Sequence, residues 1–507
     1  MKSISKPTAA ALCLFAFPSL AQAEISATDV WTNLTAMTAA IGGDLSASLT
    51  ETGDTLTVND IVATFELPKD AGSFTFHAGT LSLIAQPDGS VELIQPKAQT
   101  ITAVFQEDGA QKFSASAYVT LSDNVTRAVG DPGDITYDYS IASYRLDIGD
   151  IMAEDTKGPV PDISGHFAAS DILASTRITQ GALIGVSGRT TYGNYEFDYE
   201  VSQNGTPVIN QTQRADDAAF TYDSAFPASG MSIMNMAAAL RDGLTISAQT
   251  TSGKTTGHGS QIDPNMGQFD HRLSVATTAA EISFDTRGLR MDVTATDYDI
   301  SAEMLDIMPF PITGSMADVA FKMLIPVLAN DTPGDAVYSF TLDQLTMGDD
   351  LWNLFDPQSV LPRDPATVSL DLSAKLSILT DLLDVAAMSN LTSTPLLAQE
   401  VSLNALNVVL AGASLTGNGA VTLDNDDMDT FEGIPAPSGT FDFVLTGAND
   451  LMDSLVSMGL LPEDQAMGAR MMLGLFARPG EGEDTLTSKI EIDGATGAIS
   501  ANGQRLQ

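Results

Sequence analysis

The chain has 507 residues, with 23 Lys and Arg against 65 Asp and Glu, a single Cys and a formal net charge of −42. Such an acidic protein is repelled by phosphate backbones, so we expect no nucleic-acid partner. One cysteine excludes a disulfide framework and a thiolate zinc site. Because 44% of the residues are hydrophobic, the chain can still bury a substantial apolar core.

The first 23 residues have the pattern of a secretory signal peptide. Lys2 and Lys6 are positively charged, residues 9–17 are apolar, and residues 21–23 (AQA) form a small-x-small cleavage motif. Cleavage would leave 484 residues with 21 basic and 65 acidic side chains, a charge of −44, and no cysteine. We therefore predict a periplasmic protein, with secretion from the cell as the alternative.

No later stretch has the length and apolarity of a membrane span. The nearest, residues 307–329, contains Asp318 and Lys322 and several interruptions. The sequence predicts no integral membrane segment in the mature chain.

Alternation of apolar and polar residues is the dominant pattern. In residues 61–67, Ile61, Ala63 and Phe65 share one face, and the same period recurs at residues 113–121, 135–141, 244–248, 317–325, 368–376, 413–423 and 441–445. Closely spaced turn signals such as Asn204-Gly205 favour antiparallel neighbours. We predict a mainly β protein with long antiparallel sheets, forming either an elongated groove or a sandwich-like core, and a few capping helices.

Helical spacing predicts helices over residues 26–41, 231–241, 449–458 and 463–476. Methionine is rare before residue 230 and frequent after it, which suggests a boundary near Phe226-Pro227. The predicted organisation is a signal peptide (1–23), an N-terminal antiparallel β region that opens with a helix (24–226), a middle helix-plus-β region (227–400) and a C-terminal β region with two helices (401–507). These regions could belong to one continuous sheet.

An acidic turn after residue 423 is the candidate metal site. Hard carboxylate oxygens are the ligands that calcium prefers, but the spacing departs from the EF-hand pattern, and a solvated turn is the alternative reading. We predict no cofactor and no catalytic residue, because the four histidines are scattered and no nucleophile-base motif is present. The candidate calcium ligands are Asp424, Asp426, Asp427 and Asp429.

Residues 348–357 (GDDLWNLFDP) and 361–366 (LPRDPA) resemble a recurring stretch of an uncharacterised bacterial envelope family, domain of unknown function 2125. Shorter matches lie at residues 417–419, 437–439, 458–461 and 500–504. The resemblance covers nearly all of the mature chain and is most specific over residues 340–507. It implies export to the envelope of a double-membraned bacterium, and it carries over no catalytic residues.

The chain is similar, more loosely, to AsmA-type envelope proteins, which resemble bridge-like lipid carriers with an apolar groove. The shared features are an export signal, long antiparallel strands and glycine-punctuated strands near the C terminus. The signal here has a cleavage motif, which departs from the retained anchor of those proteins and argues against tethering to a membrane.

These observations predict a non-enzymatic, exported envelope protein that binds lipid or another apolar ligand or supports the outer membrane, with lipid or envelope proteins as partners. A structural or interaction module with a closed core and no ligand is the first alternative. A polysaccharide or peptidoglycan hydrolase is the second, because carboxylate pairs that meet only in space leave no sequence motif.

Overall fold

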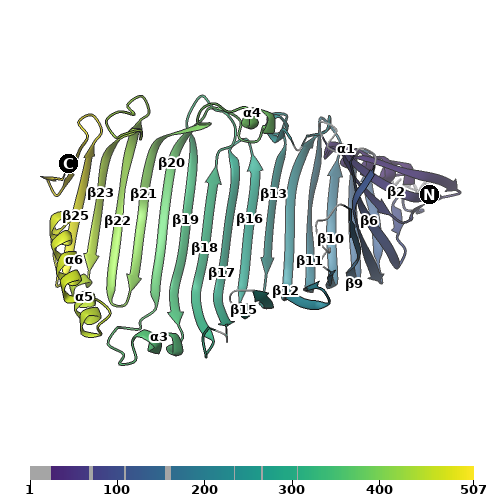
Figure 1. Ribbon diagram of the computed structural model, residues 1–507. Helices are drawn as coiled ribbons and strands as arrows, with labels where there is room; N and C mark the ends of the chain where they lie inside the picture. The colour runs from purple at the N-terminus through teal and green to yellow at the C-terminus, as the bar shows by residue number, and fades with distance from the viewer. Residues whose placement is uncertain are drawn as a thin grey trace, which may run out of the picture.

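The computed structural model describes residues 24–67, 72–107, 110–154, 162–232, 234–263, 267–304 and 307–506. Within these residues, 27 strands form one sheet, and the strands pair in antiparallel fashion (Figure 1). The predicted mainly β, antiparallel fold is therefore confirmed. The predicted signal peptide lies outside the described residues.

The first part of the sheet ends with four long strands, β9–β12. It consists of β1 (Asp44–Thr52), β2 (Thr55–Glu66), β3 (Ser73–Ala78), β4 (Leu81–Ala85), β5 (Val91–Ile94), β6 (Ala98–Glu107), β7 (Ala110–Ser122), β8 (Val125–Asp131), β9 (Asp134–Ala153), β10 (Asp162–Thr179), β11 (Leu183–Gln203) and β12 (Thr206–Pro227). The second part contains β13 (Thr245–Ser252), β14 (Thr255–Asp263), β15 (Gly267–Val275), β16 (Thr277–Asp285), β17 (Gly288–Glu303), β18 (Ile312–Ile325) and β19 (Gly334–Met347). The last part contains β20 (Ala366–Ile378), β21 (Leu396–Leu410), β22 (Ala413–Asp424), β23 (Ala436–Thr446), β24 (Arg478–Pro479), β25 (Thr485–Asp493), β26 (Ala498–Ala501) and β27 (Gln504–Arg505).

The helices of the described residues are α1 (Ala27–Ala40), α2 (Met236–Arg241), α3 (Asp349–Phe355), α4 (Val385–Ser389), α5 (Ala448–Ser457) and α6 (Glu463–Phe476). The predictions for residues 26–41, 449–458 and 463–476 agree with α1, α5 and α6. The prediction over residues 231–241 was too long, because Asn235 caps α2 by accepting a hydrogen bond from the backbone N–H of Ala238. No described helix has the length and apolarity to cross a membrane.

Several short strands are halves of one long strand. β13 pairs with residues 219–225 of β12 and β14 with residues 209–215, so the two lie end to end beside it. On the other side, β13 pairs with β16 and β14 pairs with β15, and both β15 and β16 then pair with β17. The sheet is thus a succession of long up-and-down strands, and it continues across both predicted boundaries, near residues 226 and 400.

A row of kinks, which we call the kink row, crosses these long strands at one level. Adjacent strands are interrupted opposite one another; between β12 and β17 the interruptions fall at residues 217, 253–254, 276 and 297. An extra residue bends a strand, so a row of them folds the sheet along a line across its strands. Asp and other short polar residues tolerate the left-handed backbone that such a kink uses. The kink-row residues with φ between 43° and 53° are Asp60, Asp123, Asp171, Asp217, Asp297 and Gln344.

The kinks keep apolar side chains on one face of the sheet. In β17, Met291 and Val293 occupy odd positions before Asp297, whereas Tyr298 and Ile300 occupy even positions after it. If the strand ran through Asp297 without the kink, its second half would present its polar side chains on that face. We call the two sides of the sheet the apolar face and the polar face.

The apolar face lies on the inside of the bend. Ala169, Ala215, Ala218 and Val275 flank the kink row on this face, and their exposed fractions are only 4, 1, 7 and 3%. Farther from the kink row, on the same face, Ile282 is 39% exposed. A bend toward the apolar face explains the difference, because it brings the two halves of each strand together over the residues at the kink.

The N-terminal part of the sheet curls around α1. This helix contacts the adjacent strands β1, β2 and β4, and also β11, which is several strands away from them in the order of pairing. It begins with a capping box between Ser26 and Asp29, and its buried Val30 packs with Leu83 and Tyr137. The hydroxyl of Tyr137 donates a hydrogen bond to Asn33 over 2.9 Å. A smaller buried cluster surrounds Leu240 of α2.

Candidate functional site

The apolar face from β17 to β23 presents a continuous apolar surface on which function could rest. One row of cross-strand partners joins Val293, Phe321, Phe340, Leu370 and Leu406 of five successive strands. Successive strands lie about 4.8 Å apart, so the face from β12 to β25 extends for about 50 Å. We call the part on β17–β23 the open apolar face.

This face is only half covered. The side chains of the row above are half-buried, and Ile300 and Tyr338 on the same face are 38% and 44% exposed. The two buried clusters of the described residues lie around α1 and α2, and neither contains a residue of β18–β23. Monomeric proteins rarely leave so much contiguous apolar area in water unless it meets a partner or ligand.

A pocket of about 310 Å³ lies at one end of the open apolar face, beneath α3. Its floor consists of apolar-face residues of β17, β18 and β19, including Ile300, Ile312 and Met347. Trp352 of α3 and Arg363 of the following loop form its wall (Figure 1 shows α3 beside the ends of β18 and β19). The pocket is therefore continuous with the apolar face but has charged groups at its rim.

The loop after α3 is held by a buried carboxylate. Asp356 is 1% exposed and accepts hydrogen bonds from the backbone N–H groups of Val360 and Leu361, over 2.9 and 3.0 Å. Desolvation opposes ionisation of this carboxyl, but these two N–H groups and the nearby Arg363 hold its pKa below the usual range. A Pro follows at 357 and prevents the helix from continuing. The loop is thus fixed where it crosses the sheet.

Arg363 connects several parts of the pocket wall. Its guanidinium donates to Asp349 over 3.0 Å, to the side chain of Asn353 over 2.9 Å and to the backbone carbonyl of Asp356 over 2.9 Å. The same group lies 5.6 Å from the centre of the Trp352 ring. Its Nε atom is buried and has no hydrogen-bond partner in the described structure. Three of the five N–H groups are thus paired, and Nε–H and one N–H of Nη1 remain unpaired.

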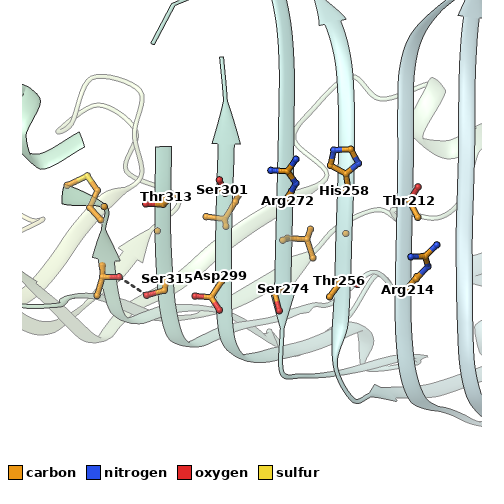
Figure 2. A pocket seen from close by; sticks show the side chains of 17 residues that line it. Thr212, Arg214, Thr256, His258, Arg272, Ser274, Asp299, Ser301, Thr313 and Ser315 are labelled. Carbon is orange, nitrogen blue, oxygen red and sulfur yellow. Dashed lines mark hydrogen bonds between the residues drawn. The ribbon is translucent and has the colours of Figure 1, made fainter. Parts of the chain in front are cut away.

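A second, larger recess of about 730 Å³ lies on the polar face. Figure 2 shows its side chains in two rows across the strands: Thr212, His258, Arg272, Ser301 and Thr313 in one, and Arg214, Thr256, Ser274, Asp299 and Ser315 in the other. Both arginines are paired with acids, Arg214 with Glu196 over 2.9 Å and Arg272 with Glu303 over 3.3 Å. The hydrogen bond from Arg214 lowers the pKa of Glu196. The recess therefore offers many hydroxyl groups but little free positive charge.

The two pockets share the backbone of Thr313-Gly314 and of Thr346-Met347 as a common wall. Alternate residues of a strand point to opposite faces, so one strand segment supplies apolar side chains to one pocket and polar side chains to the other. Of these two, the pocket beneath α3 has the more apolar lining, which a hydrocarbon ligand requires.

The candidate calcium ligands lie in the turn after β22 but do not converge. Asp427 accepts hydrogen bonds from the backbone and side chain of Thr430, which lower the pKa of its carboxyl, and Asp424 accepts one from the N–H of Asp426. Across the described ranges, no three His, Cys, Asp or Glu side chains are arranged to hold a metal ion. The structure therefore does not assemble Asp424, Asp426, Asp427 and Asp429 into a ligand set.

Comparison with known proteins identifies one family. A family model described as an uncharacterized protein conserved in bacteria (DUF2125) matches residues 257–503. This part of the chain, from β14 to β26, belongs to that family, and the resemblance expected from the sequence is confirmed there. No curated protein and no solved structure matches the chain. The likeness to AsmA-type proteins stays a prediction.

The pocket beneath α3 was missed by the sequence reasoning, although its wall lies in the segment that indicated the family. Residues 348–357 and 361–366 form α3, its buried Asp356 turn and Arg363. The signal was the close spacing of Trp352, Asp356 and Arg363 in a short polar stretch between two strands.

Proposed function

We propose that the chain is an exported protein of the bacterial cell envelope that binds the hydrocarbon chains of lipids on its open apolar face. The proposal includes no reaction and no cofactor. One observation carries it: a row of half-buried apolar side chains continues across β17–β21 on the inside of a bent sheet. Export rests on the signal-like residues 1–23 and on the implication of the family resemblance.

The burial of hydrocarbon on this face is sufficient for binding. A fully buried methylene contributes about 0.8 kcal/mol, so about twelve methylenes covered on one side contribute roughly 5 kcal/mol. Two chains side by side, or one that also enters the pocket beneath α3, would offset the loss of translational and rotational freedom on association.

The closed-core alternative fits the described residues less well. A sandwich requires a second apolar layer over this face. The described strands form a single sheet, and the residues of β18–β23 belong to neither buried cluster. An open binding surface accounts for the half-exposed side chains, and a closed interaction module does not.

A matched pair of variants on β19 tests the proposal. Tyr338 lies on the apolar face opposite Met323, whereas Ser339 lies on the polar face opposite Lys322. We expect Tyr338→Asp to reduce co-purified lipid at least tenfold in native mass spectrometry, because a carboxylate among acyl chains loses its hydration. Ser339→Asp should retain wild-type lipid. A lipid-free wild-type protein across several gentle preparations, or equal lipid in both variants, would refute the proposal.

A further inference from the structure

We propose that the pocket beneath α3 binds the head end of a single acyl chain, with the carbonyl oxygen of its carboxylic acid or ester accepting a hydrogen bond from Arg363. This inference rests on the proposed function and specifies one site within it. The pocket lies at the end of the open apolar face, so a chain whose head is in the pocket can continue along that face.

The size of the pocket selects one chain. Its volume of about 310 Å³ is at the lower end of the range for small-molecule sites, which is about 300–1,000 Å³. The floor residues Ile300, Ile312 and Met347 are apolar, and Leu351 and Leu410 extend the apolar lining. A multi-chain lipid would have to leave its other chains on the open face.

The free donor of Arg363 defines the head group. The Nη1 atom of Arg363 makes one hydrogen bond, to Asp349, so its second N–H can donate to an oxygen that the ligand brings into the pocket. Asp349, Asn353 and the Asp356 carbonyl hold the guanidinium in place before the ligand arrives. A hydrocarbon without oxygen would fill the pocket but leave this N–H unpaired.

Asp349 affects whether the pocket prefers a fatty acid or an acyl ester. Its carboxylate is 83% exposed, lies 3.0 Å from Arg363 and partly neutralises it, and Asp364 adds a second negative charge to the pocket lining. These charges disfavour an ionised fatty acid relative to a neutral acyl ester. Removal of the Asp349 charge should therefore favour the acid selectively.

Trp352 reports directly on the pocket. The chain contains two tryptophans, so Trp31→Phe leaves Trp352 as the sole emitter in the full-length protein. The probes are 2-bromododecanoic acid, its methyl ester and 1-bromododecane, all with bromine at the head end, because bromine quenches tryptophan only at close range. We expect all three to quench Trp352, with the acid and the ester binding at least tenfold more tightly than the bromoalkane.

Two variants of the pocket wall complete the test. Arg363→Lys retains the positive charge but lacks the planar fork of donors that pairs with Asp349 and the ligand at once, and we expect it to reduce the preference for the carbonyl probes to less than threefold. Asp349→Asn should tighten binding of the acid several-fold and leave the ester unchanged. Equal affinities of the bromoalkane and the carbonyl probes, or an unchanged preference in Arg363→Lys, would overturn the head-group assignment.

A variant that fills the pocket tests this site separately from lipid binding on the open apolar face. Ala302→Phe places a large ring on the pocket floor, and we expect it to abolish quenching of Trp352 while lipid still co-purifies on the open face. If no probe quenches Trp352 in the unplugged protein that retains its co-purified lipid, the pocket proposal is wrong and the open-face proposal stands. If lipid is also absent, both are wrong.

Discussion

The N-terminal part of the sheet and the sheet from β17 to β23 have the same alternating sequence pattern but opposite burial. Around α1, Val58, Leu83 and Val91 are completely buried. On the open apolar face, Phe321 and Phe340 remain half-exposed although they are larger and equally apolar. Alternation therefore determines which face of a strand is apolar, but not whether anything covers that face.

The difference arises from one helix and from curvature. α1 contacts both β4 and β11, so the sheet between them closes around a helix whose Val30 and Ala40 are fully buried. α3, α5 and α6 lie at the ends and edges of the later strands instead (Figure 1). The N-terminal part is thus stabilised by a closed core. The stability of the later part rests on the hydrogen bonds between its strands and on whatever covers its apolar face.

The largest expected effect comes from cavity formation in the closed core. Leu83→Ala should lower the free energy of unfolding of the N-terminal part by about 3 kcal/mol, because a fully buried Leu leaves a cavity that the core cannot fill. Leu370→Ala on the open apolar face should cost about 1 kcal/mol or less, since water already reaches that residue. Denaturant titration with local probes measures both; similar costs would contradict the comparison.

Alkaline pH should also affect the closed core first. Burial raises the pKa of Tyr139 to about 12 and that of Tyr137 above its usual range. Because the folded state retains these protons, the contribution to stability is complete below the unfolded pKa of about 10 and is lost as pH rises through about 12. Thermal melts between pH 8 and 12 should show the core melting before the open sheet, and Tyr139→Phe should reduce that pH dependence. Loss of the open sheet first would be the contrary result.

The smallest expected effect concerns the ion pair beside α2. Arg241 donates to Asp381 over 2.5 and 2.6 Å, and this pairing lowers the pKa of Asp381, with the N–H of Ala329 acting in the same direction. The stabilisation is present above the unfolded pKa of about 3.9 and is lost as pH falls through the lower folded value. We expect Asp381→Asn to cost about 1 kcal/mol at pH 7, because Arg241 is half-exposed. The difference in free energy of unfolding between the wild type and Asp381→Asn, measured by denaturant titration, should vanish below pH 3. A difference that persists there would show that Asp381 stabilises the fold by something other than its charge.

Much of the fold could be predicted from the sequence because period-two alternation is a local property. Residues 61–66, 113–121 and 368–376 lie in strands as expected, although β2 ends one residue before the predicted Leu67, and the helix over 463–476 has the predicted bounds. α3 and α4 could not be predicted, because helices of seven and five residues are too short to show a period.

The kink row and the pocket depend on contacts that no local pattern reveals. Asp297 is one acid among 65 in the chain, and nothing in its immediate sequence distinguishes a kink from a solvated strand residue. The pocket joins Ile300 to Trp352 and Arg363, more than fifty positions away along the chain. Only the register of β17, β18 and β19 brings these residues together.

The extra residue at each kink has a consequence for how this chain can vary. Deleting Asp297 alone would leave the alternation intact, because Ala295, Tyr298 and Ile300 would then follow one another two residues apart. The strand would lose its bend but not its sidedness, and the same holds for a lone deletion at Asp171 or Asp217. A one-residue insertion or deletion elsewhere in a strand would instead carry every residue beyond it to the opposite side, whereas loops at the strand ends can grow or shrink without disturbing it.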